Sequence, residues 1–227
     1  MTLPVNTTAE LKLSNLKKYY LDNRTIRSYC LPMTIGRPLE FNPDIALDSA
    51  MQLFWRKGYE SSSLQDLIDV MGLSKSSFYQ TFKSKHALFQ SCLKQYRKML
   101  IADMNAQLKK TGSGKTFIHN LFHYVVNETR GTNARRGCLL MNTASEFAQT
   151  DPEIAHLVSA SIDNFTHVFE KAILQGQEQG DISTDKDAHA LATYLVSSMG
   201  GLRNIVKAGA DRKTIKRIAD ITLSALD

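Results

Sequence analysis

Residues 72–89 read GLSKSSFYQTFKSKHALF, and this stretch decides the fold expected around it. Gly72 is a typical helix stop and Ser74 a typical helix cap, so a single residue separates one helix from the next. In the short helix that follows, Phe78 and Phe82 share the inward face. A helix that only packs would carry mixed charges on its outer face. This outer face instead carries small polar groups, a lysine and a tyrosine: Lys75, Ser76, Ser77, Tyr79, Gln80 and Thr81.

Two helices are expected before this segment. Asn42-Pro43 pairs a helix cap with a first-turn proline, and the apolar rhythm that follows ends at Gly58. Ser62-x-x-Gln65 is a capping-box pattern that starts the second helix. The buried face of that helix comprises Leu64, Leu67, Ile68 and Met71. Two short helices joined by a glycine turn, with a packing helix before them, make a helix-turn-helix layout.

Positive charge is concentrated around the same segment. The chain of 227 residues has a net charge of +6, and residues 70–102 contain six Lys or Arg and no acid. Residues 1–33 have five basic residues against two acidic ones, and the remainder is slightly acidic. This distribution predicts a polyanionic partner at the helix-turn-helix. The simpler alternative is a helical hairpin with a solvated basic face.

The residue types on the outer face suit recognition of duplex DNA. A recognition helix places its first turns in the major groove, while donors around it hold the phosphates. Lys75 and Gln80 can read guanine and adenine edges respectively. Lys85 stands at the start of the next helix, where its ammonium is placed to bind a phosphate.

With WRKGYESSSLQDLIDVM before it, the quoted stretch resembles the N-terminal domain of the TetR/AcrR transcriptional repressors, over residues 36 to about 100. The resemblance implies a phosphate-facing cap at Ser62 or Ser63. Apart from the resemblance, Arg37, just before Pro38, is expected to reach DNA. Two later stretches, GCLLMNTASEF at 137–147 and AGADRKTIKRI at 208–218, resemble the ligand and dimer helices of one subgroup. The direct DNA contacts that the resemblance implies are Lys75, Ser76, Ser77, Tyr79, Gln80 and Lys85.

The rest of the chain is also expected to be helical. A longer helix runs from Lys85 to about Met104, and Thr111-Gly-Ser-Gly breaks the pattern. Asp151-Pro152 and Thr184-x-x-Asp187 are favourable helix starts. No stretch has the pattern of a strand, so the expected fold is all-α. The later helices are expected near 115–130, 137–149, 152–179, 185–208 and 211–225.

Four parts are expected along the chain. Residues 36–84 form a DNA-binding domain, with the helix-turn-helix at about 62–82. Residues 85–110 form a connecting helix, and residues 111–227 form a ligand-binding and dimerisation domain. Residues 1–35 are a basic extension with two interpretations: sequence upstream of a later start, or an arm that adds phosphate contacts.

Aromatic and methionine side chains at helical spacing suggest a ligand cavity in the last domain, although such residues more often form plain core. The candidate ligand contacts are Phe117, Phe122, Cys138, Met141, Phe165, Phe169, Tyr194 and Met199. A stripe with small residues, which let two helices approach closely, predicts the dimer interface. Its members are Leu191, Leu195, Ser198, Gly201, Leu202 and Ile205.

Two other kinds of sensor remain open. Cys138 follows Arg135 and Arg136, whose charges favour a reactive thiolate, although a buried cysteine more often acts as a small apolar residue. His119 and His123 lie one helical turn apart, a spacing that can bind a metal, but no third ligand is evident. No nucleophile–base pair and no metal triad is recognisable, so we expect neither an enzyme nor a cofactor.

The predicted function is a ligand-responsive repressor that binds a pseudo-palindromic operator as a homodimer and releases it when a small, largely apolar or aromatic molecule binds. The alternatives are a constitutive DNA-binding protein and a redox- or metal-responsive one. No apolar run reaches the length of about 18 residues that a membrane helix needs, and the three cysteines have no disulfide-framework spacing. Without signal-peptide features at the N-terminus, we expect a cytoplasmic protein and no membrane contact.

Overall fold

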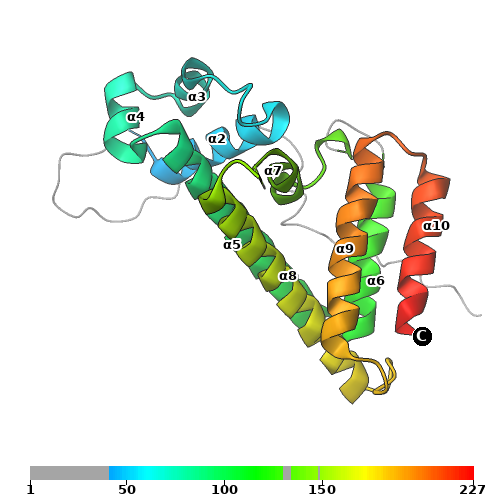
Figure 1. The fold of residues 1–227 in the computed structure, drawn as a ribbon. Coiled ribbons are helices and arrows are strands. Elements are labelled where there is room, and N and C mark those ends of the chain that lie inside the picture. Colours follow the sequence, from blue (N-terminus) through cyan, green and yellow to red (C-terminus); the bar gives the residue numbers. More distant parts are fainter. Residues whose placement is uncertain (1–40, 130–133, 148) are drawn as a thin grey trace, which may run out of the picture. The chain divides into compact units, whose positions relative to one another are not determined.

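The structure, a computed structural model, describes residues 41–129, 134–147 and 149–227 (Figure 1). These ranges contain nine α-helices, two short 3-10 helices and no strand, which confirms the all-α prediction. None of the helices in the described ranges has an apolar stretch long enough to cross a membrane. The predictions for residues 1–35 and for Arg37 lie outside the described residues.

The first three helices form the predicted helix-turn-helix layout. Asn42 caps the first of them by accepting the backbone N–H of Asp44 at 2.9 Å. Gly58 ends that helix and Gly72 ends the next, with φ angles of 80° and 65° that favour glycine. The three helices are α2 (Pro43–Lys57), α3 (Leu64–Met71) and α4 (Lys75–Phe82).

The predicted cap of α3 was one residue too early. Ser63 is the N-cap: its Oγ accepts the N–H of Asp66 at 3.0 Å, and the Asp66 carboxylate accepts the N–H of Ser63 at 3.1 Å. Ser62 is fully buried, and its hydroxyl donates to the carbonyl of Gly58 at 2.7 Å. In the run of three serines, either Ser62 or Ser63 could be the N-cap. The structure has Ser63 in this position, where the carboxylate of Asp66 completes the capping box.

The later helices lie within a few residues of the predicted ranges, with two differences. The helix that starts at Lys85 continues past Met104 to Thr111. Asp187 is itself the cap of α9, accepting the N–H of Ala190 at 2.9 Å, so that helix does not begin at Thr184. The elements are α5 (Lys85–Thr111), α6 (Gly114–Asn127), η1 (Ala134–Arg136), α7 (Leu139–Phe147), α8 (Pro152–Glu178), α9 (Ala188–Lys207), α10 (Arg212–Leu223) and η2 (Ser224–Leu226).

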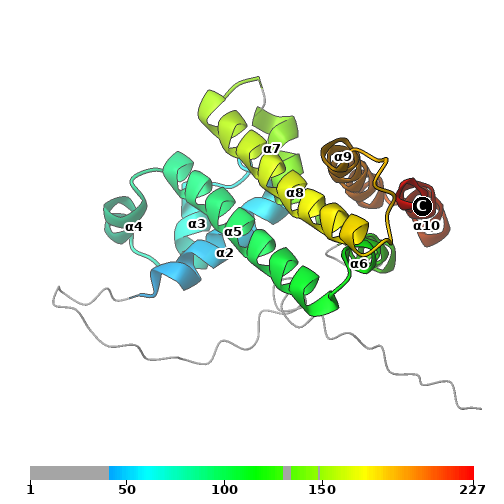
Figure 2. The ribbon, with the colours of Figure 1, turned by 90° about the horizontal axis from the view of Figure 1, so that it is seen from below.

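The two longest helices, α5 and α8, run side by side in the same direction (Figures 1 and 2). His86 and Asp151 join their starts, and near their ends the side chain of Gln175 donates to the carbonyl of Gly112 at 3.0 Å. α2 packs on the first half of α5, while α6 and α9 pack on α8. The pair therefore connects the helix-turn-helix with the C-terminal helices.

Candidate DNA-binding site

Small residues and one buried ring hold α4 in place. Ser74 caps the helix as predicted, because its Oγ accepts the N–H of Ser77 at 3.2 Å. The same oxygen lies 2.9 Å from the hydroxyl oxygens of Ser76 and Ser77. Phe78 is fully buried and fixes which side of α4 faces the protein. The opposite side is therefore left for contacts outside the chain.

The predicted contact residues of α4 lie on that outer side. Lys75, Ser76, Tyr79 and Gln80 are exposed, and the other two, Ser77 and Thr81, are half-buried. Tyr79 exposes 45% of its surface although it is aromatic. Ser63 is exposed at the start of α3, whereas the buried Ser62 cannot face a phosphate. This correction leaves Ser63 as the phosphate-facing candidate of the pair.

Lys85 lies at the start of α5, held against an aromatic ring. Its Nζ is 4.2 Å from the ring centroid of Tyr59, a distance typical of a cation–π contact. Tyr59 follows Gly58 at the end of α2, so the contact links α2 to the predicted phosphate-binding lysine. Sequence reasoning missed Tyr59, because no local pattern directs this aromatic toward a lysine so far along the chain.

A second contact, also missed from the sequence, joins this region to the C-terminal helices. The Nε2 of His86 lies 2.6 Å from Oδ2 of Asp151, the N-cap of α8, and Gln90 donates to Glu153 at 2.7 Å. The N–H of Ile154 and then His86 lower the pKa of the Asp151 carboxyl. These two contacts connect the start of α5 to the start of α8.

Comparisons with known proteins agree with this geometry. A model of bacterial regulatory proteins of the tetR family matches residues 46–92, and a tetracyclin repressor-like C-terminal domain matches residues 114–222. An uncharacterised helix-turn-helix-type transcriptional regulator of Bacillus subtilis (strain 168), YezE, is 34% identical over 194 residues, which cover 85% of this chain and all of YezE. The chain belongs to the TetR family. TetR-family proteins are DNA-binding transcription regulators and not enzymes, which confirms the predicted class.

Two other relatives cover most of the chain. The helix-turn-helix-type transcriptional repressor ComR of Escherichia coli (strain K12) is 28% identical over 200 residues, covering 88% of this chain and 95% of ComR. A solved structure of a cysteine-substituted CifR bound to 26-base-pair double-stranded operator DNA has a TM-score of 0.72 and 28% identity. It covers 85% of this chain and 100% of the CifR chain.

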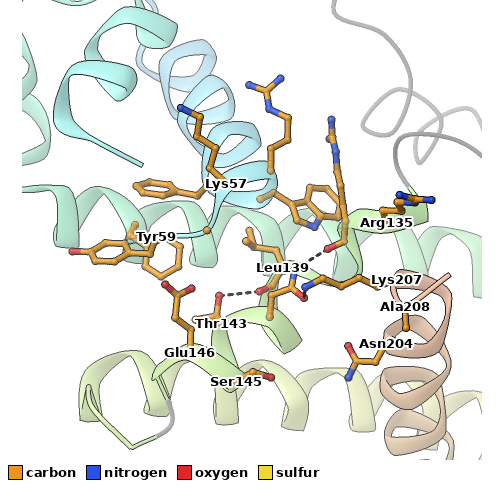
Figure 3. A pocket seen from close by; sticks show the side chains of 17 residues that line it. Lys57, Tyr59, Arg135, Leu139, Thr143, Ser145, Glu146, Asn204, Lys207 and Ala208 are labelled. Atoms are coloured by element: carbon orange, nitrogen blue, oxygen red, sulfur yellow. Dashed lines mark hydrogen bonds between the residues drawn. The ribbon is translucent and has the colours of Figure 1, made fainter. Parts of the chain in front are cut away.

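A cavity of about 880 Å³ lies between the end of α2, the η1–α7 segment and the end of α9 (Figure 3). On the α2 side, Nε1 of Trp55 donates to the carbonyl of Gly137 at 3.2 Å. On the α9 side, Nζ of Lys207 donates to Oδ1 of Asn142 at 2.8 Å. The wall formed by η1 and α7 is therefore attached both to the DNA-binding helices and to the C-terminal ones.

None of the eight predicted ligand contacts lines this cavity. Phe117, Phe122 and Phe169 belong to the buried core of the C-terminal helices, and Cys138 is also buried. Tyr194 is 44% exposed on the outer side of α9. The remaining three, Met141, Phe165 and Met199, are partly buried. The role of these eight residues in ligand binding stays a prediction.

The predicted dimer stripe on α9 contains two residues that cannot reach a partner. Leu195 and Leu202 are 0% and 1% exposed because they pack into the chain's own core. Gly201 and Ile205 are exposed, and the other two members, Leu191 and Ser198, are partly buried. The outer face of α9 therefore includes only part of the predicted stripe, Gly201 and Ile205, together with Tyr194.

The candidate redox and metal groups also have defined surroundings. The hydroxyl of Tyr96 donates to Sγ of Cys138 across 3.9 Å. The rings of His119 and His123 lie 6.2 Å apart, and burial, then His123 and Lys115, lower the pKa of His119. Within the described ranges, no three His, Cys, Asp or Glu side chains gather closely enough to bind a metal. Redox and metal sensing stay predictions.

Proposed function

We propose that this TetR-family chain is a homodimeric repressor that reads a pseudo-palindromic operator with one α4 helix from each protomer. The exposed, donor-rich side of α4 carries this proposal, because packing gives no reason to expose Tyr79 beside Lys75 and Gln80. Support also comes from the relative CifR, which was solved on operator DNA. A small organic molecule would release the DNA.

The exposed groups divide into two roles. Lys75 and Gln80 lie on α4 itself and suit base edges in the major groove. Ser63 and Lys85 lie beside the helix and Tyr79 lies on it; these three suit phosphates, which position the protein without reading sequence. Loss of a base contact should therefore change sequence preference, whereas loss of a phosphate contact should weaken binding to every sequence.

A second copy of the chain fits the outer face of the C-terminal helices. A single helix-turn-helix makes few contacts, and a twofold-related pair reads two half-sites. Tyr194 and Ile205 on α9 and Ile221 on α10 expose 44%, 39% and 71% of their surfaces. Burying such side chains against a partner stabilises a dimer by about 25 cal/mol per Å² of apolar surface.

The operator can be found by selecting bound sites from a random-sequence duplex pool and from DNA upstream of the coding sequence. We expect a two-half-site sequence whose affinity falls steeply with salt. Lys85→Ala should weaken binding to all sequences and reduce the salt slope by about one. Gln80→Ala or Lys75→Ala should relax one base position, at a loss of about 1–3 kcal/mol.

Lys109→Ala is the matched control, since Lys109 is an exposed lysine at the far end of α5. It should leave both affinity and sequence preference unchanged. Equal, sequence-independent losses in the Lys85 and Gln80 variants would contradict the division of roles. Failure to select any sequence would contradict the proposed function itself.

A further inference from the structure

The cavity of Figure 3 has an uneven charge distribution that the DNA-binding role does not use. Among the described residues that line it, five are basic and one is acidic. The acidic one, Glu146, already accepts the backbone N–H of Glu60 at 3.3 Å. The five basic residues are Arg56, Lys57, Arg135, Arg136 and Lys207. The cavity therefore favours a negatively charged occupant.

Lys207 is the basic residue directed into the cavity. Figure 3 shows it reaching from the end of α9 toward α7, whereas Lys57 and Arg135 point away from Leu139 and Thr143. The ammonium of Lys57 also forms an ion pair with Asp66 at 3.1 Å. The ammonium of Lys207 bonds the neutral amide of Asn142 at 2.8 Å, and no carboxylate of a described residue forms an ion pair with it. Two of the three donor positions of an ammonium remain for another acceptor.

The opposite side of the cavity is apolar and aromatic. Phe54, Trp55 and Leu139 contribute to its lining and are almost fully buried. A volume of about 880 Å³ is large enough for a small organic molecule, since ligand cavities commonly measure about 300–1,000 Å³. One end of the cavity thus offers a cation and amide groups, and the other is bounded by buried apolar side chains, with the Arg136 guanidinium 5.8 Å from the ring centroid of Trp55.

We propose that this cavity binds a small organic anion, an aromatic carboxylate, with its carboxylate on Lys207 and its ring against the Trp55 side. The proposal that a carboxylate binds is argued from the cavity lining alone. Its effect on DNA binding rests on the proposed repressor function. The site is distinct from the eight aromatic, Met and Cys positions expected from the sequence.

A ligand in this cavity can affect the DNA-binding surface through α2, α9 and the contact between Tyr59 and Lys85. Its walls come from α2 and from α9, so an occupant acts on the spacing between them. Tyr59 lines the cavity and also holds Lys85 at 4.2 Å. A ligand that fits only the arrangement incompatible with the operator spacing would lower DNA affinity by about 5- to 150-fold.

Direct binding can be measured without DNA, because Trp55 is the only tryptophan of the chain and lies in the cavity wall. The probes are benzoate, phenylacetate and naphthalene-2-carboxylate, each compared with its neutral amide. We expect at least one carboxylate to change Trp55 fluorescence saturably and its amide to bind about tenfold more weakly or worse. Calorimetric titration provides the second readout. Absence of saturable binding by all three carboxylates, or equal binding of the amides, would overturn the proposal.

Two substitutions of Lys207 distinguish a loss of its positive charge from a loss of folding. Lys207→Gln should weaken the carboxylate about tenfold, whereas Lys207→Arg should retain most of the affinity. Lys171→Gln removes an exposed lysine of α8 outside the cavity and should have no effect. Circular dichroism and melting temperature verify that each variant is folded. Unchanged carboxylate affinity in a folded Lys207→Gln protein would exclude this site.

The regulatory consequence needs a separate measurement on the selected operator. The best carboxylate should lower operator affinity about fivefold or more in the wild type and not in Lys207→Gln. Carboxylate binding without an effect on DNA would leave the site correct and contradict its role as the effector site. If Lys207→Gln instead loses operator affinity while carboxylate binding persists, the basic residues serve DNA and the proposal fails.

Discussion

Asp48 on α2 carries a charge that its surroundings do not compensate. Its Oδ1 is buried and has no hydrogen-bond partner among the described residues. Burial raises the pKa of this carboxyl above the ordinary value of 3.8. A raised pKa means that the folded state holds the proton more tightly than the unfolded state, so ionisation of Asp48 opposes folding.

Asp48→Asn should therefore increase the free energy of unfolding at neutral pH, because the amide keeps the shape of the side chain and removes its charge. The penalty is complete above the raised folded pKa and disappears as the pH falls below 3.8. Urea unfolding of both proteins from pH 7 to pH 3.5 checks this, with the difference shrinking toward acid. A constant difference across that range would mean that Asp48 is not the titrating group.

The contact between α6 and α8 depends on a glycine at the first turn of α6. A Cβ placed on Gly114 would lie 1.8 Å from the carbonyl oxygen of Ala172 and 3.1 Å from the backbone nitrogen of Gly176. Both atoms belong to the backbone of α8, so no side-chain rotation can relieve the overlap. The two helices approach this closely only because Gly114 has no side chain.

Gly114→Ala should destabilise the protein by about 3 kcal/mol or more, since a backbone must shift to accept the methyl group. The measurement is urea unfolding followed by circular dichroism. Thr116→Ala is the control on the same helix, because Thr116 is exposed and should change stability by less than about 0.5 kcal/mol. Near-wild-type stability of Gly114→Ala would show that α6 and α8 do not pack this closely.

The presence and the ends of a helix were predictable where only one residue could act as its cap or stop. Gly58, Gly72 and Ser74 each occupy the predicted position, because helix termination and capping are local events. The serine run before α3 left two registers, and only the position of Asp66 distinguishes them. Local chemistry therefore predicts elements well and fails where neighbouring residues compete for one role.

Contacts between distant segments were not predictable from patterns. The Lys85–Tyr59 contact and the Trp55–Gly137 hydrogen bond depend on how helices cross, which apolar spacing does not specify. The spacing of apolar residues along α9 also does not determine which side of this helix packs against the chain's own core. Leu202 satisfies the predicted stripe, but a helix flanked by other helices buries more than one line of apolar residues.

At the scale of the assembled molecule, we predict that the proposed dimer depends on the exposed face of α9 at Ile205. Ile205 is 39% exposed on the line shared with Tyr194 and Gly201, so an aspartate there leaves the chain's own core intact. In a dimer formed through this face, Ile205→Asp would bury an unpaired carboxylate in each protomer, at a cost of about 3 kcal/mol or more. We expect a helical monomer in sedimentation and loss of operator binding, since one half-site alone holds the protein weakly. Leu174→Asp places the same charge at a 47% exposed apolar position on α8 and should leave the dimer intact. If Leu174→Asp is monomeric and Ile205→Asp remains dimeric, the interface lies on α8 and the predicted interface on α9 is wrong.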